Sequence, residues 1–336
     1  MFGFIRSISF TVQVMIPVLG LTLFGIAWFL PGNLQSSGIY GNGSYYQPAD
    51  GWLYPFWLSM ARLPLWAQIL PSCLVAVLTA GLLVRTDMKN LLLRTRSYAI
   101  AYVFLFLVTS GGHFFLFHPV MLAGYFMVMS YRFLLDLYKE ETGYSIVFAM
   151  GFSWGVAILI YPPVCLLIPA LLVGLLLMVT TNWRHWLVSL MGILVPTLLV
   201  GFFWFLVGYL DYEIFAFFSW FKLRHALFPA FISKEPFIAA WFGLILIWVV
   251  IASMKYRNPK IQSRQLFQAN FLLFISILVM MVFMETVSVE VLWLLTIPVS
   301  YLMTFWALNM ERGWLRDLFF FTLLLSFAFF RIRGLI

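Results

Sequence analysis

Long apolar runs alternate with short polar connections along nearly the whole chain. A helix needs about 20 mostly apolar residues to cross the hydrocarbon core of a bilayer, and about ten or eleven of these runs approach that length. The pattern predicts an all-α fold, a polytopic bundle of about 11 transmembrane helices that forms one membrane domain over 1–336. The expected spans are 8–30, 64–84, 97–116, 119–137, 145–160, 162–181, 186–207, 237–254, 267–285, 291–309 and 317–332.

Two prolines interrupt the apolar sequence between the fifth and sixth runs. Pro162 and Pro163 separate 145–160 from 162–181, and a proline inside a helix removes a hydrogen bond and clashes with the preceding turn. Two arrangements remain open for this pair of runs. One is a tight helical hairpin, and the other is a broken, partly re-entrant element that the rest of the protein buries.

The composition excludes a soluble protein. Hydrophobic residues make up 64% of the chain and charged residues 10%, against roughly 25% charged residues in a soluble domain. One positive charge, Arg6, precedes the first run and no small-residue cleavage site follows, so we expect an uncleaved first span rather than a signal peptide. Cys73 and Cys165 lie within apolar runs and are expected to be packing thiols rather than disulfide or metal ligands.

The basic residues predict the orientation. With the amino terminus in the cytoplasm, 14 of the 20 lysine and arginine residues fall on the cytoplasmic side, as the positive-inside rule expects. This predicts a multi-pass protein of the bacterial inner membrane, and it explains the net charge of +8 without a nucleic-acid partner. The basic loops 85–96 and 255–264 are expected to contact anionic lipids. Arg331 and Arg333 fall on the outer side, so whether the last run crosses the membrane stays open.

The first long outer loop, 31–63, contains a candidate catalytic residue. Its second half is aromatic, which predicts a short interfacial helix over 54–63, with Asp50 in the turn before it. Asp50 has two interpretations: a solvated carboxylate, or a general base or divalent-metal ligand whose basicity rises beside low-dielectric lipid. No metal-ligand motif accompanies it, so no metal site is predicted, and this divalent ion is the one cofactor that we consider.

The second long outer loop, 208–236, predicts another interfacial helix. Acids come first and bases last along 211–225, which is the order that the helix dipole favours. The bases Lys222, Arg224 and His225 are candidate contacts for the phosphate or pyrophosphate of a lipid-linked donor, since arginine can bind phosphate through two parallel hydrogen bonds. The alternative is interfacial anchoring and capping of the helix end.

The remaining charged and polar positions near the ends of runs have structural interpretations. Arg132 and Asp136 are four residues apart on one helix and are expected to pair. His118 is expected to be a hydrogen-bonded turn residue, with a proton relay or a substrate contact as the alternative. No charge lies in the middle of any run, which argues against an ion pump or a proton-coupled carrier.

Three segments carry a resemblance to a known group of proteins. Residues 151–163 read GFSWGVAILIYPP, 182–186 read NWRHW, and 192–196 read GILVP. Together they resemble an uncharacterised family of bacterial multi-pass inner-membrane proteins over about 95–200. That family has no established activity, so the resemblance implies a topology and little chemistry.

The layout of the outer loops resembles the GT-C membrane glycosyltransferases, which use polyprenyl-phosphate-linked sugar donors. Those enzymes have an acid in the first outer loop and a longer outer loop between spans seven and eight, the positions of Asp50 and 208–236 in this chain. Asp50 lies further from the first span than is usual there and has no acidic neighbour. Such likeness of layout does not by itself establish function.

Two functional classes follow from these patterns. The first is a lipid-linked sugar transferase or envelope-glycan assembly protein, with Asp50 as base and Lys222, Arg224 and His225 as donor contacts. The second is a non-catalytic membrane subunit or a lipid or solute transporter, which packs against protein partners in the membrane. Membrane lipids are expected partners in both classes, and the sequence leaves open whether the protein is an enzyme.

Overall fold

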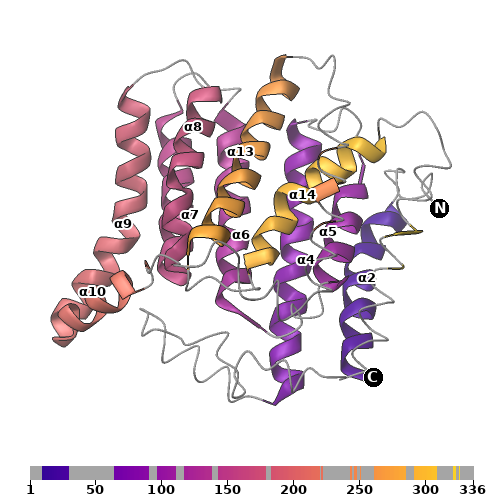
Figure 1. Cartoon of the computed structure of the whole chain (residues 1–336), viewed down its shortest axis with the longest axis horizontal. Helices are drawn as coiled ribbons and strands as arrows, with labels where there is room; N and C mark the ends of the chain where they lie inside the picture. Colours follow the sequence, from indigo (N-terminus) through magenta and orange to yellow (C-terminus); the bar gives the residue numbers. More distant parts are fainter. Residues whose placement is uncertain are drawn as a thin grey trace.

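A computed structural model describes residues 10–29, 64–90, 97–110, 117–137, 143–178, 183–219, 221, 243, 246, 247, 250, 261–284, 291–308, 321, 322 and 325. Within these ranges nearly every residue is helical and no strand occurs, which confirms the all-α class. The helices lie side by side as a bundle, with α2 at one edge and α9 at the other (Figure 1). The predicted interfacial helix at 54–63 lies outside the described residues.

The helices coincide with most of the predicted runs, because each run is apolar enough to stay helical across a bilayer. The fully described elements are α2 (Phe10–Phe29), α4 (Leu65–Asn90), α5 (Ala99–Ser110), α6 (Pro119–Leu137), α7 (Tyr144–Ile160), the 3-10 helix η3 (Pro162–Leu167), α8 (Ile168–Met178), α9 (Trp183–Val207), α10 (Leu210–Ser219), α13 (Ile261–Phe283) and α14 (Leu292–Leu308). Among the described helices, three segments are long and apolar enough to span a membrane, namely Ala67–Lys89, Pro119–Leu137 and Trp183–Val207. The total of about eleven spans stays a prediction.

Two contacts and one short connection align the ends of α4, α6, α7 and α9. Lys89 Nζ lies 2.7 Å from Asp136 Oδ2, so the carboxyl ends of α4 and α6 are adjacent. A short connection leads from α6 to α7, and the Tyr144 ring stacks on His185 with centroids 4.9 Å apart, which places the amino ends of α7 and α9 together. We call this the basic end of the bundle, because it carries Arg85, Lys89, Arg132 and Arg184.

The polypeptide reverses at the predicted proline break. Tyr161 is extended (φ −140°, ψ 92°), and Pro162 and Pro163 open η3, which continues directly into α8. Because α7 begins at the basic end and α8 returns there before α9 begins, the structure favours the hairpin over the re-entrant alternative. Proline suits the first helical positions because its missing N–H needs no partner there.

Small residues allow α7 and α9 to pack closely in parallel. A Cβ on Gly151 would overlap the carbonyl of Ser189, and a Cβ on Gly155 would lie 2.5 Å from the carbonyl oxygen of Ile193. The spacing Gly151-x-x-x-Gly155 is the small-residue pattern that lets membrane helices approach through their backbones. On the other side of α7, Ser130 of α6 donates a hydrogen bond to the carbonyl oxygen of Met150 at 2.8 Å.

Trp293 is the centre of the packing among α5, α6 and α14. It is fully buried, its ring meets Phe104 edge-on at 5.7 Å, and it lies where a Cβ on Gly124 would be. A side-chain hydrogen bond from Asn270 to the carbonyl oxygen of Pro298, 3.0 Å long, joins α13 to α14. Such interhelical bonds stabilise membrane helix packing by about 0.6 kcal/mol on average.

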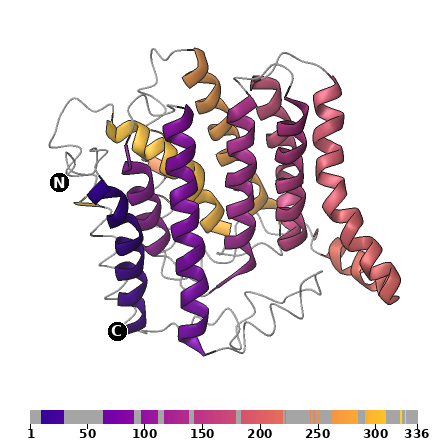
Figure 2. The same cartoon turned by 180° about the vertical axis from the view of Figure 1, so that it is seen from behind.

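A capping motif at Gly208 ends α9 and lets the chain turn into α10. Gly208 has φ +81°. Its N–H donates a hydrogen bond to the carbonyl oxygen of Phe205, and the N–H of Tyr209 donates one to the carbonyl oxygen of Trp204. These are the two hydrogen bonds of a Schellman cap. α10 then extends from the end of the bundle opposite the basic end (Figure 2). Asp211 lies in its first turn, as predicted.

The prediction of one continuous helix over 211–225 fails at Phe221, and 222–225 lie outside the described residues. α10 stops at Ser219, and Phe221 lies outside it, with its N–H bonded to the carbonyl of Phe218 at 3.0 Å. A bond three residues back is the tightened form in which many helices end. Favourable charge at a helix end contributes only about 0.3–1 kcal/mol, which is too little to determine how far the helix extends.

Candidate functional site

The residues that the sequence selected for chemistry lie outside the described parts of the chain. This holds for Asp50, the candidate base, and for the donor contacts Lys222, Arg224 and His225. Their roles therefore remain sequence predictions. The described residues instead reveal a pocket at the basic end, which the sequence analysis did not identify.

One face of α4 forms the main wall of this pocket. Val77, Gly81, Arg85 and Lys89 follow one another at four-residue intervals, so they line a single stripe of the helix. The stripe is apolar toward the middle of the helix and cationic toward its end. Gly81 leaves the wall open, because a Cβ built there meets no atom within 4 Å.

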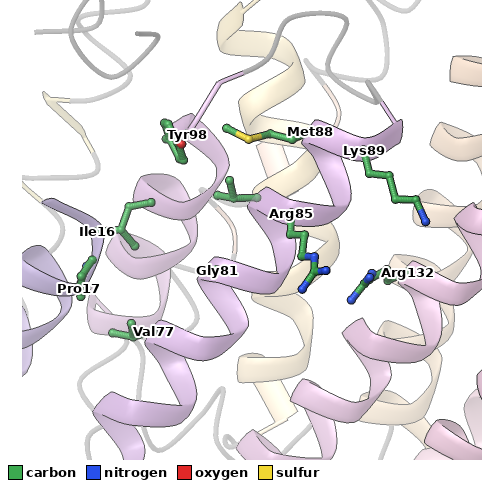
Figure 3. A pocket seen from close by; sticks show the side chains of 10 residues that line it. Ile16, Pro17, Val77, Gly81, Arg85, Met88, Lys89, Tyr98 and Arg132 are labelled. Carbon is green, nitrogen blue, oxygen red and sulfur yellow. The ribbon is translucent and has the colours of Figure 1, made fainter. Parts of the chain in front are cut away.

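The pocket has a volume of about 760 Å³ and combines an apolar side with a cationic side. Figure 3 shows the apolar side chains of α2 and α4 on one side and the charged groups of α4 and α6 on the other. The lining residues are Ile16, Pro17, Val77, Gly81, Val84, Arg85, Met88, Lys89, Tyr98 and Arg132.

Two guanidinium groups converge in the pocket. The side chains of Arg85 and Arg132 point toward one another from neighbouring helices (Figure 3). Neither forms an ion pair with a carboxylate of the described residues, and Nε of Arg132 is buried without a hydrogen-bond partner there. Like charges repel, so two guanidinium groups that face one another favour an anion between them.

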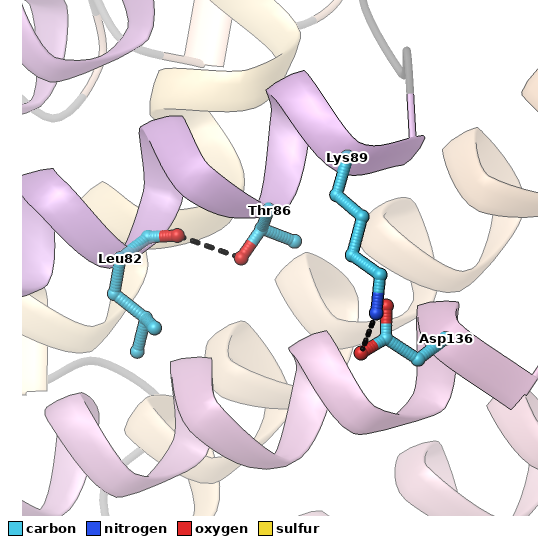
Figure 4. Close-up of polar contacts among 4 residues, drawn as sticks. All are labelled: Leu82, Thr86, Lys89 and Asp136. Atoms are coloured by element: carbon cyan, nitrogen blue, oxygen red, sulfur yellow. Dashed lines mark hydrogen bonds and ion pairs between the residues drawn. The ribbon is translucent and has the colours of Figure 1, made fainter.

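The predicted Arg132–Asp136 pair is replaced by a pair between helices. Asp136 forms an ion pair with Lys89 of α4, with 2.7 Å between Oδ2 and Nζ (Figure 4). The Asp136 side chain is only 10% exposed. The prediction was wrong for a physical reason: a base four residues before an acid is the weaker order for pairing along a helix. Lys89 reaches Asp136 from the next helix, and Arg132 is left to face the pocket.

The other acid of this region points away from the pocket. Asp87 follows Arg85 by two positions, which is about 200° around the helix, and it is 1% exposed. Beside it, Thr86 donates its hydroxyl to the carbonyl oxygen of Leu82 at 2.7 Å, as Figure 4 shows. Among the described carboxylates, Asp136 therefore borders the cationic side, so Arg85, Arg132, Lys89 and Asp136 carry a formal net charge of +2.

His118 has the structural role predicted for it. Its Nδ1 accepts the N–H of Val120 at 3.2 Å at the start of α6, and burial lowers the pKa of its imidazole to about 3. The neutral ring satisfies a backbone donor that the helix leaves unpaired. In the described part of the chain no group of three metal-ligating side chains occurs.

Comparisons with known proteins add no assignment to this geometry. No family model, curated protein or solved structure matches the chain. Both resemblances from the sequence therefore remain predictions. The glycines of the segment that carries the first resemblance, Gly151 and Gly155, pack α7 against α9 and lie apart from the pocket.

Proposed function

We propose that this chain is a multi-pass protein of the bacterial inner membrane that binds an anionic, phosphate-bearing lipid between α2, α4, α5 and α6. The observation that carries the proposal is the convergence of Arg85 and Arg132, without a described carboxylate between them, beside an apolar wall. Guanidinium groups match phosphate oxygens in shape and charge.

The two-sided character of the pocket favours a lipid over a soluble anion. Ile16, Pro17 and Val77 provide an apolar surface next to the cations, which a free phosphate ion would not use. A lipid would place its head group on the arginines and its hydrocarbon chain along α2 and α4. Basic pockets between transmembrane helices on the cytoplasmic side are typical sites for anionic lipid head groups, and the topology predicted from the basic residues assigns this end to the cytoplasm.

This proposal belongs to the second functional class, the non-catalytic membrane subunit or the lipid or solute transporter. Its support is the convergence of two guanidinium groups beside an apolar wall. The transferase hypothesis depends on Asp50 and on the second outer loop, and it would act at the opposite membrane surface. A lipid bound at the basic end is compatible with either functional class of this protein.

Lipid retention by purified variants tests the proposal. The full chain is purified in mild detergent, and bound phosphatidate (dioleoyl phosphatidic acid) is measured by native mass spectrometry for the wild type and for a double variant, Arg85→Gln with Arg132→Gln. Each charge-assisted hydrogen bond contributes about 1.5–3 kcal/mol, so we expect the double variant to bind at least about tenfold more weakly.

Arg184→Gln is the matched control, because Arg184 lies at the same end of the bundle but does not line the pocket. It should bind phosphatidate like the wild type. Equal binding by the wild type and the double variant would overturn the proposal. An equal loss in the control and the double variant would show attraction to basic surface in general, and would also overturn it.

A further inference from the structure

We infer that the pocket selects a lipid whose phosphate is a terminal monoester over a lipid whose phosphate is a diester. This inference rests on the proposed lipid-binding function and names the chemical class of the head group. It follows from the charge around the pocket, from the free donors, and from the space beside them.

The charge balance favours a dianion. Lys89 is held by Asp136 at 2.7 Å, so the two partners largely neutralise one another. Arg85 and Arg132 then present two positive charges without a described counter-charge. A phosphomonoester carries about 1.5–2 negative charges at pH 7, whereas a diester such as phosphatidylglycerol carries one. A diester would leave part of the repulsion between the guanidinium groups uncompensated.

The donors favour a phosphate with three free oxygens. The guanidinium ends of Arg85 and Arg132 face one another (Figure 3), and the two terminal nitrogens of Arg132 can bind two oxygens of one phosphate side by side. Arg85 approaches from the neighbouring helix (Figure 3) and can take a third oxygen. A diester has only two non-bridging oxygens, so it cannot satisfy both guanidinium groups as fully.

The space of the pocket suits one hydrocarbon attachment to the phosphate. The apolar side chains of Ile16, Pro17 and Val77 lie on one side, toward α2, and the cations lie on the other. A monoester has a single substituent, which can follow Val77 and Gly81. The second substituent of a diester would lie on the cationic side, beside Arg85, Lys89 and Arg132, where no apolar surface receives it.

Competition between two lipids in detergent tests the inference. Dioleoyl phosphatidate is the monoester probe, dioleoyl phosphatidylglycerol is the diester probe, and native mass spectrometry of the full chain reports the ratio of their affinities. We expect at least a fivefold to tenfold preference for phosphatidate. Arg132→Lys keeps the charge but loses the paired donors, so it should bind both lipids and keep only part of the preference, clearly below that of the wild type.

The outcomes separate this inference from the proposed function. A wild-type preference below twofold, with both lipids lost in the Arg85→Gln and Arg132→Gln double variant, would overturn the head-group selectivity alone. Binding of both lipids that the double variant does not change would overturn the pocket itself. Inorganic phosphate at 10 mM, as an added competitor, should leave the bound phosphatidate in place; displacement by it would overturn the lipid as the occupant.

Discussion

At the scale of single residues, Gly81 is the lining position at which a larger side chain would narrow the pocket. A Cβ at this position meets no atom within 4 Å, so a larger side chain would extend into the pocket without displacing its neighbours. We expect Gly81→Leu to reduce phosphatidate binding about tenfold or more. The stability of the Gly81→Leu variant should not fall below that of the wild type, because leucine is favoured over glycine inside a helix by about 0.5–1 kcal/mol. Lipid binding by native mass spectrometry and the melting temperature measure the two effects.

Gly25 of α2 provides the control for this substitution. It also has no atom within 4 Å of a built Cβ, and it does not line the pocket. Gly25→Leu should leave lipid binding unchanged. Unaltered binding by the Gly81→Leu variant would mean that the lipid does not lie against α4.

Asp50 provides a separate test of the transferase hypothesis. An exposed loop carboxylate contributes little to folding, whereas a general base accelerates a reaction by about 10²–10⁴-fold. If the chain is a transferase, Asp50→Asn should fail to complement a deletion strain although the protein accumulates to the wild-type level. Complementation by this variant would remove the catalytic role of Asp50 and leave the lipid-binding class.

At the scale of helices, the α7–α9 interface depends on glycines that cannot be enlarged. A side chain at Gly151 would overlap the backbone of Ser189, so the two helices would have to separate. Overpacking of this kind typically costs about 1–3 kcal/mol. Gly151→Leu should therefore lower the melting temperature clearly. Phe152→Leu, on the exposed face of the same helix, should change it much less; equal effects would argue against this interface.

The helices could be predicted well because each follows from a local apolar run. α6 begins and ends where the sequence places it, at 119 and 137. The errors arose where a neighbour decides the outcome. The spacing of Arg132 and Asp136 allows a pair, but it contains no information about Lys89 on another helix. The early end of α10 at Ser219 likewise depends on local backbone bonding that charge order does not determine.

At the scale of the whole molecule, the orientation in the membrane can be measured directly. The basic-residue distribution predicts that both long loops are outside. Single cysteines at Ser44 and Ser233, which lie outside the described residues, are introduced into a chain that lacks Cys73 and Cys165. Both should react with a membrane-impermeant thiol reagent in intact cells. Labelling only after lysis would reverse the topology and move the basic end to the outer surface.

The pocket is a property of the assembled bundle, which explains why the sequence did not reveal it. The stripe of Val77, Gly81, Arg85 and Lys89 on α4 is visible in the sequence and was a usable signal. Its partners Ile16 and Arg132 are far away in sequence, and nothing local indicates that they face it. The loop residues that the sequence did select, among them Asp50, lie outside the described residues, so their roles stay predictions.

The most direct test of the account is a high-resolution structure of the full chain in nanodiscs that contain phosphatidate, with an antibody fragment bound to aid alignment. We expect a phosphate group within about 3 Å of the guanidinium nitrogens of both Arg85 and Arg132. The attached hydrocarbon chain should lie against Val77 and Gly81. If carboxylates of the protein's own chain instead pair with both guanidinium groups, or its own side chains fill the pocket, the proposed lipid site is contradicted.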